Sequence, residues 1–229
     1  MLRGGAQAPR VIPMKFKAVL FDLDGTLLDT IEDLADSMNI VLTRMGFPAH
    51  DVAAYKYHVG DGVRELAVRV LPQDHQDEET IKKCITAMRQ EYGSRWDKKT
   101  RPYPGIPELL DTLTARGLKM AVLSNKPDQN TKIVVAKLLP KWRFDVVAGE
   151  RAGIPRKPDP GAALSIAEQL GIAPQAWLYL GDTNTDMKTA VGAGMYPVGA
   201  LWGFRTRQEL MGSGAEVVIE NPMQLLALL

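Results

Sequence analysis

Short apolar runs alternate with longer amphipathic segments over most of the chain. Six runs rich in β-branched or other apolar residues have the length of buried strands: 17–21, 119–123, 144–148, 177–180, 197–201 and 216–219. Between most of them, apolar residues recur with the spacing of one helix face, over 107–116, 129–138, 160–170 and 185–193. Strands that alternate with helices predict an α/β fold, in which a parallel sheet has helices on both faces.

Residues 31 to about 98 interrupt this alternation. Helical spacing recurs there in three stretches, 31–45, 63–70 and 79–92. No run in this region has the character of a strand. We therefore expect an all-helical domain inserted into an α/β core, with the insertion at 30–99 and the core formed by 14–29 and 100–229. Ligands of open α/β sheets bind beyond the carboxyl ends of the strands, so the insertion is expected to cover that edge as a lid.

The composition is that of a globular protein close to electrical neutrality. The 229 residues are 45% hydrophobic, and 28 basic against 27 acidic residues leave a formal charge of +1. No basic face is interleaved with aromatic residues, so nucleic acid is not an expected partner. No run has the apolar length of a membrane helix, and residues 1–13 lack the apolar stretch of a secretory signal. We expect a flexible leader at 1–13 and a cytoplasmic protein, either a monomer or a homodimer.

The first apolar run ends in two acids with one residue between them. In an extended strand, residues i and i+2 point to the same side, so Asp22 and Asp24 are expected to share one site. Two carboxylates held close together repel each other, and at neutral pH a hard metal ion is the simplest group to relieve that repulsion. The alternative is a turn that merely ends the strand, because Asp and Gly are frequent in turns.

Polar residues occur in three other segments of the expected core, Ser124-Asn125-Lys126-Pro127, Arg156-Lys157-Pro158-Asp159 and Gly181-Asp182-Thr-Asn-Thr-Asp186. The carboxyl ends of parallel strands meet at one edge, so these groups are expected to converge there. Acids, a hydroxyl and a lysine fit phosphoryl transfer, with Mg²⁺ as the metal that an oxygen-rich cluster suits. No histidine lies in these segments. The available nucleophile is therefore a carboxylate, which can form an acyl phosphate.

The motifs Phe-Asp-Leu-Asp-Gly-Thr, Leu-Ser-Asn-Lys-Pro, Arg-Lys-Pro-Asp-Pro and Gly-Asp-Thr-Asn-Thr-Asp-Met, in this order, resemble the haloacid dehalogenase superfamily. The helical insertion after the first motif is part of the resemblance. The resemblance implies a Rossmann-like core with an inserted helical cap domain, and Mg²⁺ as the cofactor. It implies that Asp22 is the nucleophile and a metal ligand. Asp24 would be the general acid and base, with its backbone carbonyl on the metal.

The same resemblance implies roles for the remaining motif residues. Ser124 would hold a phosphoryl oxygen, helped by Asn125 and by the backbone of Gly25. Lys157 would neutralise the phosphoryl oxygens and orient Asp22. Asp182 would also be a metal ligand. Asp186 would be a ligand or would support the metal site.

Three flanking stretches, 57–62, 103–105 and 200–205, resemble the phosphoglycolate phosphatases within this superfamily. The implied reaction is hydrolysis of a small phosphate ester, with 2-phosphoglycolate as the best guess. In the insertion we expect the Gly60 loop to approach the substrate, and Arg64 or His58 to bind its carboxylate. A phosphatase of a sugar phosphate, a nucleotide or pyrophosphate remains an alternative, as does a phosphosugar mutase.

The second acid, Asp24, distinguishes this chain from three other classes. Dehalogenases and phosphonatases resemble it but lack an acid at this position. A phospho-accepting signalling module such as a receiver domain needs neither this acid nor a helical insertion. Asp24 and the insertion together therefore favour a phosphatase over these classes.

Overall fold

The computed structural model describes residues 16–229, so the predicted leader at 1–13 lies outside the described residues. Its main sheet has six parallel strands in the order β5-β4-β1-β6-β7-β8. The strands are β1 (Ala18–Phe21), β4 (Lys119–Pro127), β5 (Val146–Glu150), β6 (Trp177–Gly181), β7 (Tyr196–Ala200) and β8 (Val217–Ile219). All six correspond to the predicted apolar runs, and the α/β fold class is confirmed.

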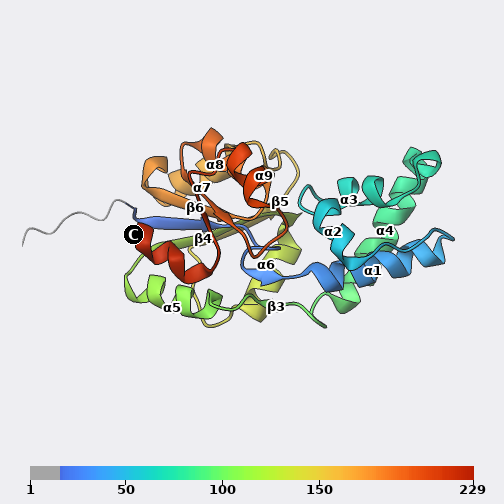
Figure 1. The fold of residues 1–229 in the computed structure, drawn as a ribbon, viewed down its shortest axis with the longest axis horizontal. Coiled ribbons are helices and arrows are strands. Elements are labelled where there is room, and N and C mark those ends of the chain that lie inside the picture. The colour runs from blue at the N-terminus through green and yellow to red at the C-terminus, as the bar shows by residue number, and fades with distance from the viewer. Residues whose placement is uncertain (1–15) are drawn as a thin grey trace, which may run out of the picture.

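Helices cover both faces of this sheet (Figure 1). One face carries α7 (Gly161–Gln169), α8 (Asn184–Ala193) and α9 (Arg207–Gly212), and the other carries α5 (Ile106–Ala115) and α6 (Asp128–Leu138). Successive side chains of β1 point to opposite faces of the sheet. Val19 and Phe21 therefore pack in one buried cluster, and Ala18 and Leu20 pack in the other. Burial on both faces explains why the central strands are continuous apolar runs.

The helices of the predicted insertion, 30–99, lie at one end of the molecule (Figure 1). It contains α1 (Ile31–Arg44), α2 (Val52–His58), α3 (Val63–Val70) and α4 (Glu78–Arg95). These helices have their own buried cluster, which includes Met38, Tyr55 and Cys84. The chain leaves and re-enters the core through a two-stranded antiparallel ribbon, β2 (Leu28–Asp29) and β3 (Arg101–Pro102). The insertion therefore follows the first core strand and its ribbon directly.

The ribbon, α2 and α9 were not expected from the sequence. Each ribbon strand has two residues, and α2 and α9 have seven and six, so none is long enough to show a clear period. Short 3₁₀ segments at Gln73–His75, Pro174–Ala176 and Pro222–Leu228 were missed for the same reason. The long, periodic elements are the ones that the pattern predicts well.

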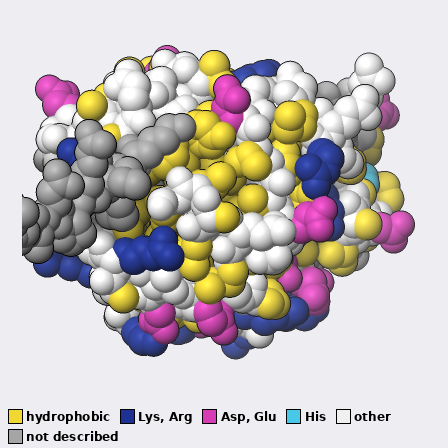
Figure 2. All heavy atoms as spheres, turned by 60° about the vertical axis from the view of Figure 1, so that its left-hand side comes forward, with side chains coloured by type: hydrophobic (Ala, Val, Ile, Leu, Met, Phe, Trp, Pro, Cys, Tyr) yellow, Lys and Arg dark blue, Asp and Glu magenta, His cyan; other side chains and the backbone are white. Residues whose placement is uncertain are grey.

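The surface of the core end far from the insertion carries charges of both signs (Figure 2). Basic and acidic side chains surround an area of hydrophobic ones, without a broad field of one sign on the visible face. Within residues 16–229, none of the helices combines the length and the apolar character needed to cross a membrane.

Candidate active site

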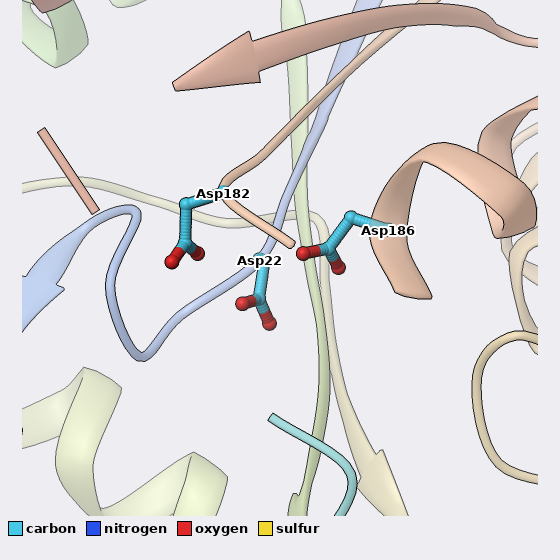
Figure 3. Close-up of side chains that lie close together, drawn as sticks. All are labelled: Asp22, Asp182 and Asp186. Atoms are coloured by element: carbon cyan, nitrogen blue, oxygen red, sulfur yellow. The ribbon is translucent and has the colours of Figure 1, made fainter. Parts of the chain in front are cut away.

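Three acidic side chains meet at the carboxyl end of the sheet (Figure 3). Asp22 follows β1, Asp182 follows β6, and Asp186 lies in the first turn of α8. One oxygen of each carboxylate lies within 4.8 Å of the others, and all three residues are buried. The three elements converge here because β1 and β6 are neighbours and α8 follows β6 after a short turn. This group can hold a metal ion.

The side chain of Lys157 lies inside the acidic group and is 3% exposed. Its Nζ is 2.7 Å from Asp22 Oδ1 and 2.6 Å from Asp186 Oδ1, and it donates to the carbonyl of Leu123 at 3.0 Å. Burial alone would lower the pKa of Lys157, but the Asp186 and Asp22 carboxylates raise that pKa well above its usual value. Lys157 is therefore a fixed cation beside Asp22.

The acids carry more negative charge than Lys157 balances. Burial, and then the charge of Asp186, raise the pKa of Asp22 well above its ordinary value. Burial and Asp186 also raise the pKa of Asp182 to about 7. The pKa of Asp182 is raised even though Thr26 Oγ1 and the Phe204 N–H donate to its carboxylate at 2.8 and 2.9 Å, because these two bonds only partly offset the increase. The repulsion between these carboxylates favours either protonation of one of them or the binding of an additional cation.

Asp186 is fixed more completely than its neighbours. It is the third residue of α8, and its Oδ2 accepts hydrogen bonds from the N–H and the hydroxyl of Thr183, which caps the helix. Its Oδ1 accepts from Lys157 and, at 3.4 Å, from the Tyr179 hydroxyl. The capping box therefore holds the carboxylate that positions the lysine.

Asp24 has different partners from the three clustered acids. Its Oδ2 is 3.2 Å from Lys126 Nζ, while its Oδ1 is buried and has no hydrogen-bond partner among the described residues. Lys126 Nζ also lies 3.1 Å from the hydroxyl of Tyr92, which belongs to α4 of the insertion. The Oδ1 atom of Asp24 is thus a buried acceptor whose hydrogen-bonding capacity is not used by the described residues.

A cavity of about 110 Å³ lies between the core and the insertion. On the core side it is lined by Asp22, Asp24, Ser124, Asn125, Lys126, Pro127 and Asn130. On the insertion side it is lined by Leu34, Val59, Gly60, Gly62, Val63, Leu66, Met88, Arg89 and Tyr92. Ser124 accepts a 3.2 Å bond from the Lys126 N–H, and its own hydroxyl hydrogen has no acceptor among the described residues. That hydroxyl can donate to a ligand beside Asp22.

Core side chains hold the loop between α2 and α3 over this cavity. Asn125 donates to the Gly60 carbonyl at 3.1 Å, and Arg156 donates to the Asp61 carbonyl at 3.1 Å. The Thr185 hydroxyl donates to the Asp61 carboxylate at 2.7 Å. The structure therefore describes the insertion closed on the core, with the predicted Gly60 loop at the cavity.

Two residues predicted to help hold the phosphoryl group, Gly25 and Asn125, have other hydrogen-bond partners in this structure. The Gly25 N–H donates to the Leu28 carbonyl at 2.8 Å, so it is not free to bind a phosphoryl oxygen. Gly25 has a φ of +90°, and a Cβ there would lie 2.3 Å from Asp182 Oδ2, so the glycine makes room for the acid.

The side-chain amide of Asn125 also has its hydrogen bonds made: it donates to the Gly60 and Lys157 carbonyls and accepts from the Lys157 N–H. Asn125 positions two loops.

The two predicted carboxylate-binding residues of the insertion do not line the cavity. Arg64 turns outward and makes an exposed two-point ion pair with Glu78, at 2.7 and 3.0 Å. His58 packs inside the insertion, with its ring 5.3 Å from that of His50 and 5.6 Å from that of Tyr55. In this arrangement neither residue lines the cavity, and a role of Arg64 or His58 in binding the carboxylate stays a prediction.

The cavity residues that the sequence pattern did not single out include Lys126, Tyr92 and Arg89. Lys126 was detectable, because it belongs to the same polar segment of β4 as Ser124 and Asn125. Tyr92 and Arg89 lie on α4, where only the helical pattern was predicted, and nothing in that pattern shows which face meets the core.

Comparison with known proteins agrees with the fold. The family profile of haloacid dehalogenase-like hydrolases matches residues 19–200. A phosphoglycolate phosphatase of Aquifex aeolicus is 33% identical over 82% of this chain and 86% of its own length. One from Pseudomonas putida is 30% identical over 92% of this chain and 78% of its own. The crystal structure of a predicted phosphoglycolate phosphatase from Haemophilus somnus has a TM-score of 0.85 at 25% identity, covering 93% and 97% of the chains.

These matches span both the sheet and the helical insertion, and they include every segment that contributes to the acidic group. The match to the family profile alone covers more than half of the chain. The chain belongs to the haloacid dehalogenase-like hydrolases and is a phosphoric monoester hydrolase.

Proposed function

We propose that this enzyme hydrolyses a small phosphate monoester, best exemplified by 2-phosphoglycolate, through an aspartyl phosphate on Asp22 and with Mg²⁺. One observation carries the proposal. The Asp22 carboxylate lines the cavity while Lys157 Nζ holds one of its oxygens at 2.7 Å. A nucleophile at the wall of a cavity between core and insertion, oriented by a fixed cation, suits attack on a phosphoryl group.

The residues present fit a magnesium ion. Three buried carboxylates face one lysine, which leaves an excess of negative charge, and all the available ligand atoms are oxygens. Asp22 and Asp182 are the proposed side-chain ligands, with the Asp24 carbonyl beside them and Asp186 in support. The ion would neutralise charge on the phosphoryl group as it is transferred.

The chain's own residues supply the remaining chemistry. An Asp22 oxygen bonds to phosphorus as the bond from phosphorus to the ester oxygen breaks, and Asp24 gives a proton to that departing oxygen. Asp24 then takes a proton from water, which attacks the acyl phosphate, so phosphate leaves and Asp22 is regenerated. The proposed partners of the phosphoryl oxygens are the Ser124 hydroxyl, which lines the cavity, and Lys157, which does not line it but donates to Asp22.

The size of the cavity supports a small substrate. A volume of about 110 Å³ suits a short phosphorylated metabolite and is below the range typical of drug-sized ligands. The named function of the Aquifex aeolicus and Pseudomonas putida relatives supports 2-phosphoglycolate. A cytoplasmic location and a monomeric or homodimeric state remain predictions.

A substrate panel tests this proposal. Phosphate release is measured with Mg²⁺ for 2-phosphoglycolate, hexose phosphates, nucleoside monophosphates and pyrophosphate at equal concentrations. We expect the highest kcat/KM for 2-phosphoglycolate. A hundredfold preference for another class of compound would replace 2-phosphoglycolate as the proposed substrate. Return of the phosphoryl group to a second hydroxyl of a sugar would identify a mutase.

A further inference from the structure

Two basic side chains contribute to the wall of the cavity. Lys126 and Arg89 line it, together with the Tyr92 hydroxyl. Most of the other insertion side chains around it are apolar, namely Leu34, Val59, Val63, Leu66 and Met88. The proposed mechanism gives no role to either cation.

Lys126 is a buried ammonium group with incomplete partners. Its side chain is 7% exposed. Its Nζ is 3.2 Å from Asp24 Oδ2, donates to the Tyr92 hydroxyl at 3.1 Å, and lies 4.6 Å from the centre of the Tyr92 ring. An ammonium has three donors, so one of them has no partner among the described residues. Burying a cation is costly unless it is paired, and a further anion would complete its shell.

Arg89 differs from the other arginines of the insertion. It precedes Tyr92 by three residues on α4, so the two side chains share a helix face. The other four, Arg44, Arg64, Arg69 and Arg95, each pair with a carboxylate. Within residues 16–229, Arg89 is exposed and its side chain has neither an ion pair nor a hydrogen bond, although it also lines the cavity. Its guanidinium is available to a ligand.

We infer that Lys126 and Arg89 are specificity-determining residues that bind a second anionic group, a carboxylate, on the leaving group of the substrate. This inference rests on the proposed phosphatase function. A guanidinium can bind a carboxylate through two parallel hydrogen bonds, and the free donor of Lys126 adds a third. Lys126 also contacts Asp24, so one residue joins recognition of the leaving group to placement of the acid that protonates it.

The test compares two substrates of similar size in the Mg²⁺-loaded enzyme. They are 2-phosphoglycolate and 2-hydroxyethyl phosphate, whose leaving group has a neutral hydroxyl in place of the carboxylate. The wild-type enzyme should have the higher kcat/KM for 2-phosphoglycolate. Arg89→Met and Lys126→Met should each lower the ratio of the two kcat/KM values at least about tenfold, as expected for loss of a charge-assisted hydrogen bond.

Lys83→Met is the matched control, because it removes an exposed cation from the same helix, where Lys83 pairs with Glu79. In Lys83→Met the ratio of the two kcat/KM values should equal that of the wild-type enzyme. Lys126→Met also disturbs Asp24, but that loss affects both substrates and cancels in the ratio. If Lys126→Met hydrolyses neither substrate, calorimetric binding of both to Asp22→Asn proteins, with and without Lys126→Met, provides the same comparison.

The outcomes separate the inference from the function on which it rests. A wild-type enzyme that hydrolyses neither compound, nor any other phosphate monoester, would refute the proposed function. An active enzyme whose ratio is unchanged in both Arg89→Met and Lys126→Met would overturn the role of these cations and leave the phosphatase intact. An active wild-type enzyme that prefers the neutral compound would also overturn it.

Discussion

The hydroxyl of Thr185, on α8 of the core, donates a 2.7 Å hydrogen bond to the carboxylate of Asp61 in the insertion. Asp61 follows Gly60, whose carbonyl is held by Asn125, so the contact lies beside the cavity. Burial alone would raise the pKa of Asp61, but the bonds from Thr185 and Arg69 lower it, so the acceptor is charged. Because a lid that closes excludes water and commits the substrate, this bond is expected to contribute to turnover.

Thr185→Val should therefore reduce kcat/KM by about tenfold or more, since a hydrogen bond to a charged group contributes about 1.5–3 kcal/mol. Thr189→Val is the control, because Thr189 lies one turn later on α8 and its hydroxyl bonds only within the helix. Steady-state kinetics compare the two variants. Equal kinetics for Thr185→Val and the wild type would show that this bond does not limit closure.

Replacement of the two motif acids should separate their roles. Asp22→Asn is expected to be inactive, because an amide is a poor nucleophile. Asp24→Asn should lose about 10²- to 10⁴-fold in kcat, the usual contribution of a general acid and base. Asp111→Asn, an exposed acid paired with Lys141, should keep wild-type activity. Thermal melts monitor folding, and a folded Asp22→Asn protein with normal rates would exclude the covalent route.

Removal of the metal should abolish activity. Exhaustive treatment with EDTA is expected to stop phosphate release, and added Mg²⁺ should restore it. Ca²⁺ should inhibit, because its looser and higher coordination allows Asp22 to bind it through both oxygens. Undiminished turnover after chelation would contradict the proposed metal dependence, as would full activity with Ca²⁺.

The acidic group should make metal-free stability depend on pH. Asp182 has an ordinary pKa near 3.8, which the fold raises to about 7, so the folded state binds more protons than the unfolded state between these values. Its contribution to the free energy of unfolding therefore falls as pH rises through this range. Bound Mg²⁺ should cancel the loss. The difference in Tm with and without Mg²⁺ should thus be larger near pH 7.5 than near pH 5, and equal differences would contradict the assignment of Asp182 to the metal.

The sequence predicts the elements that bring the motifs together. The runs ending at Phe21 and Leu180 are long and apolar enough to be recognised as strands, and parallel pairing then places Asp22 and Asp182 at one edge. Lys157 was also identified, although it lies on a loop, because its motif accompanied the other three. Local pattern and motif order are sufficient for this part of the site.

The insertion side was not predictable in the same way, because its contacts depend on how helices face the core. Arg64 and Val63 are adjacent in sequence, yet a step of one residue turns about 100° around a helix, so Val63 lines the cavity while Arg64 pairs with Glu78. The occupied N–H of Gly25 depends on a bond to Leu28 that forms only in the folded turn. Side-chain direction and competing hydrogen bonds are tertiary properties.

Detection of the phosphorylated intermediate tests the central claim most directly. The Mg²⁺-loaded enzyme is mixed with 2-phosphoglycolate, quenched in acid within one turnover, digested, and mapped by mass spectrometry, with Asp22→Asn as the control. We predict one phosphoryl group on the peptide that contains Asp22 in the wild-type enzyme, and none in Asp22→Asn. A phosphoryl group on any other residue, or rapid turnover with no phosphorylated peptide at any quench time, would contradict nucleophilic attack by Asp22.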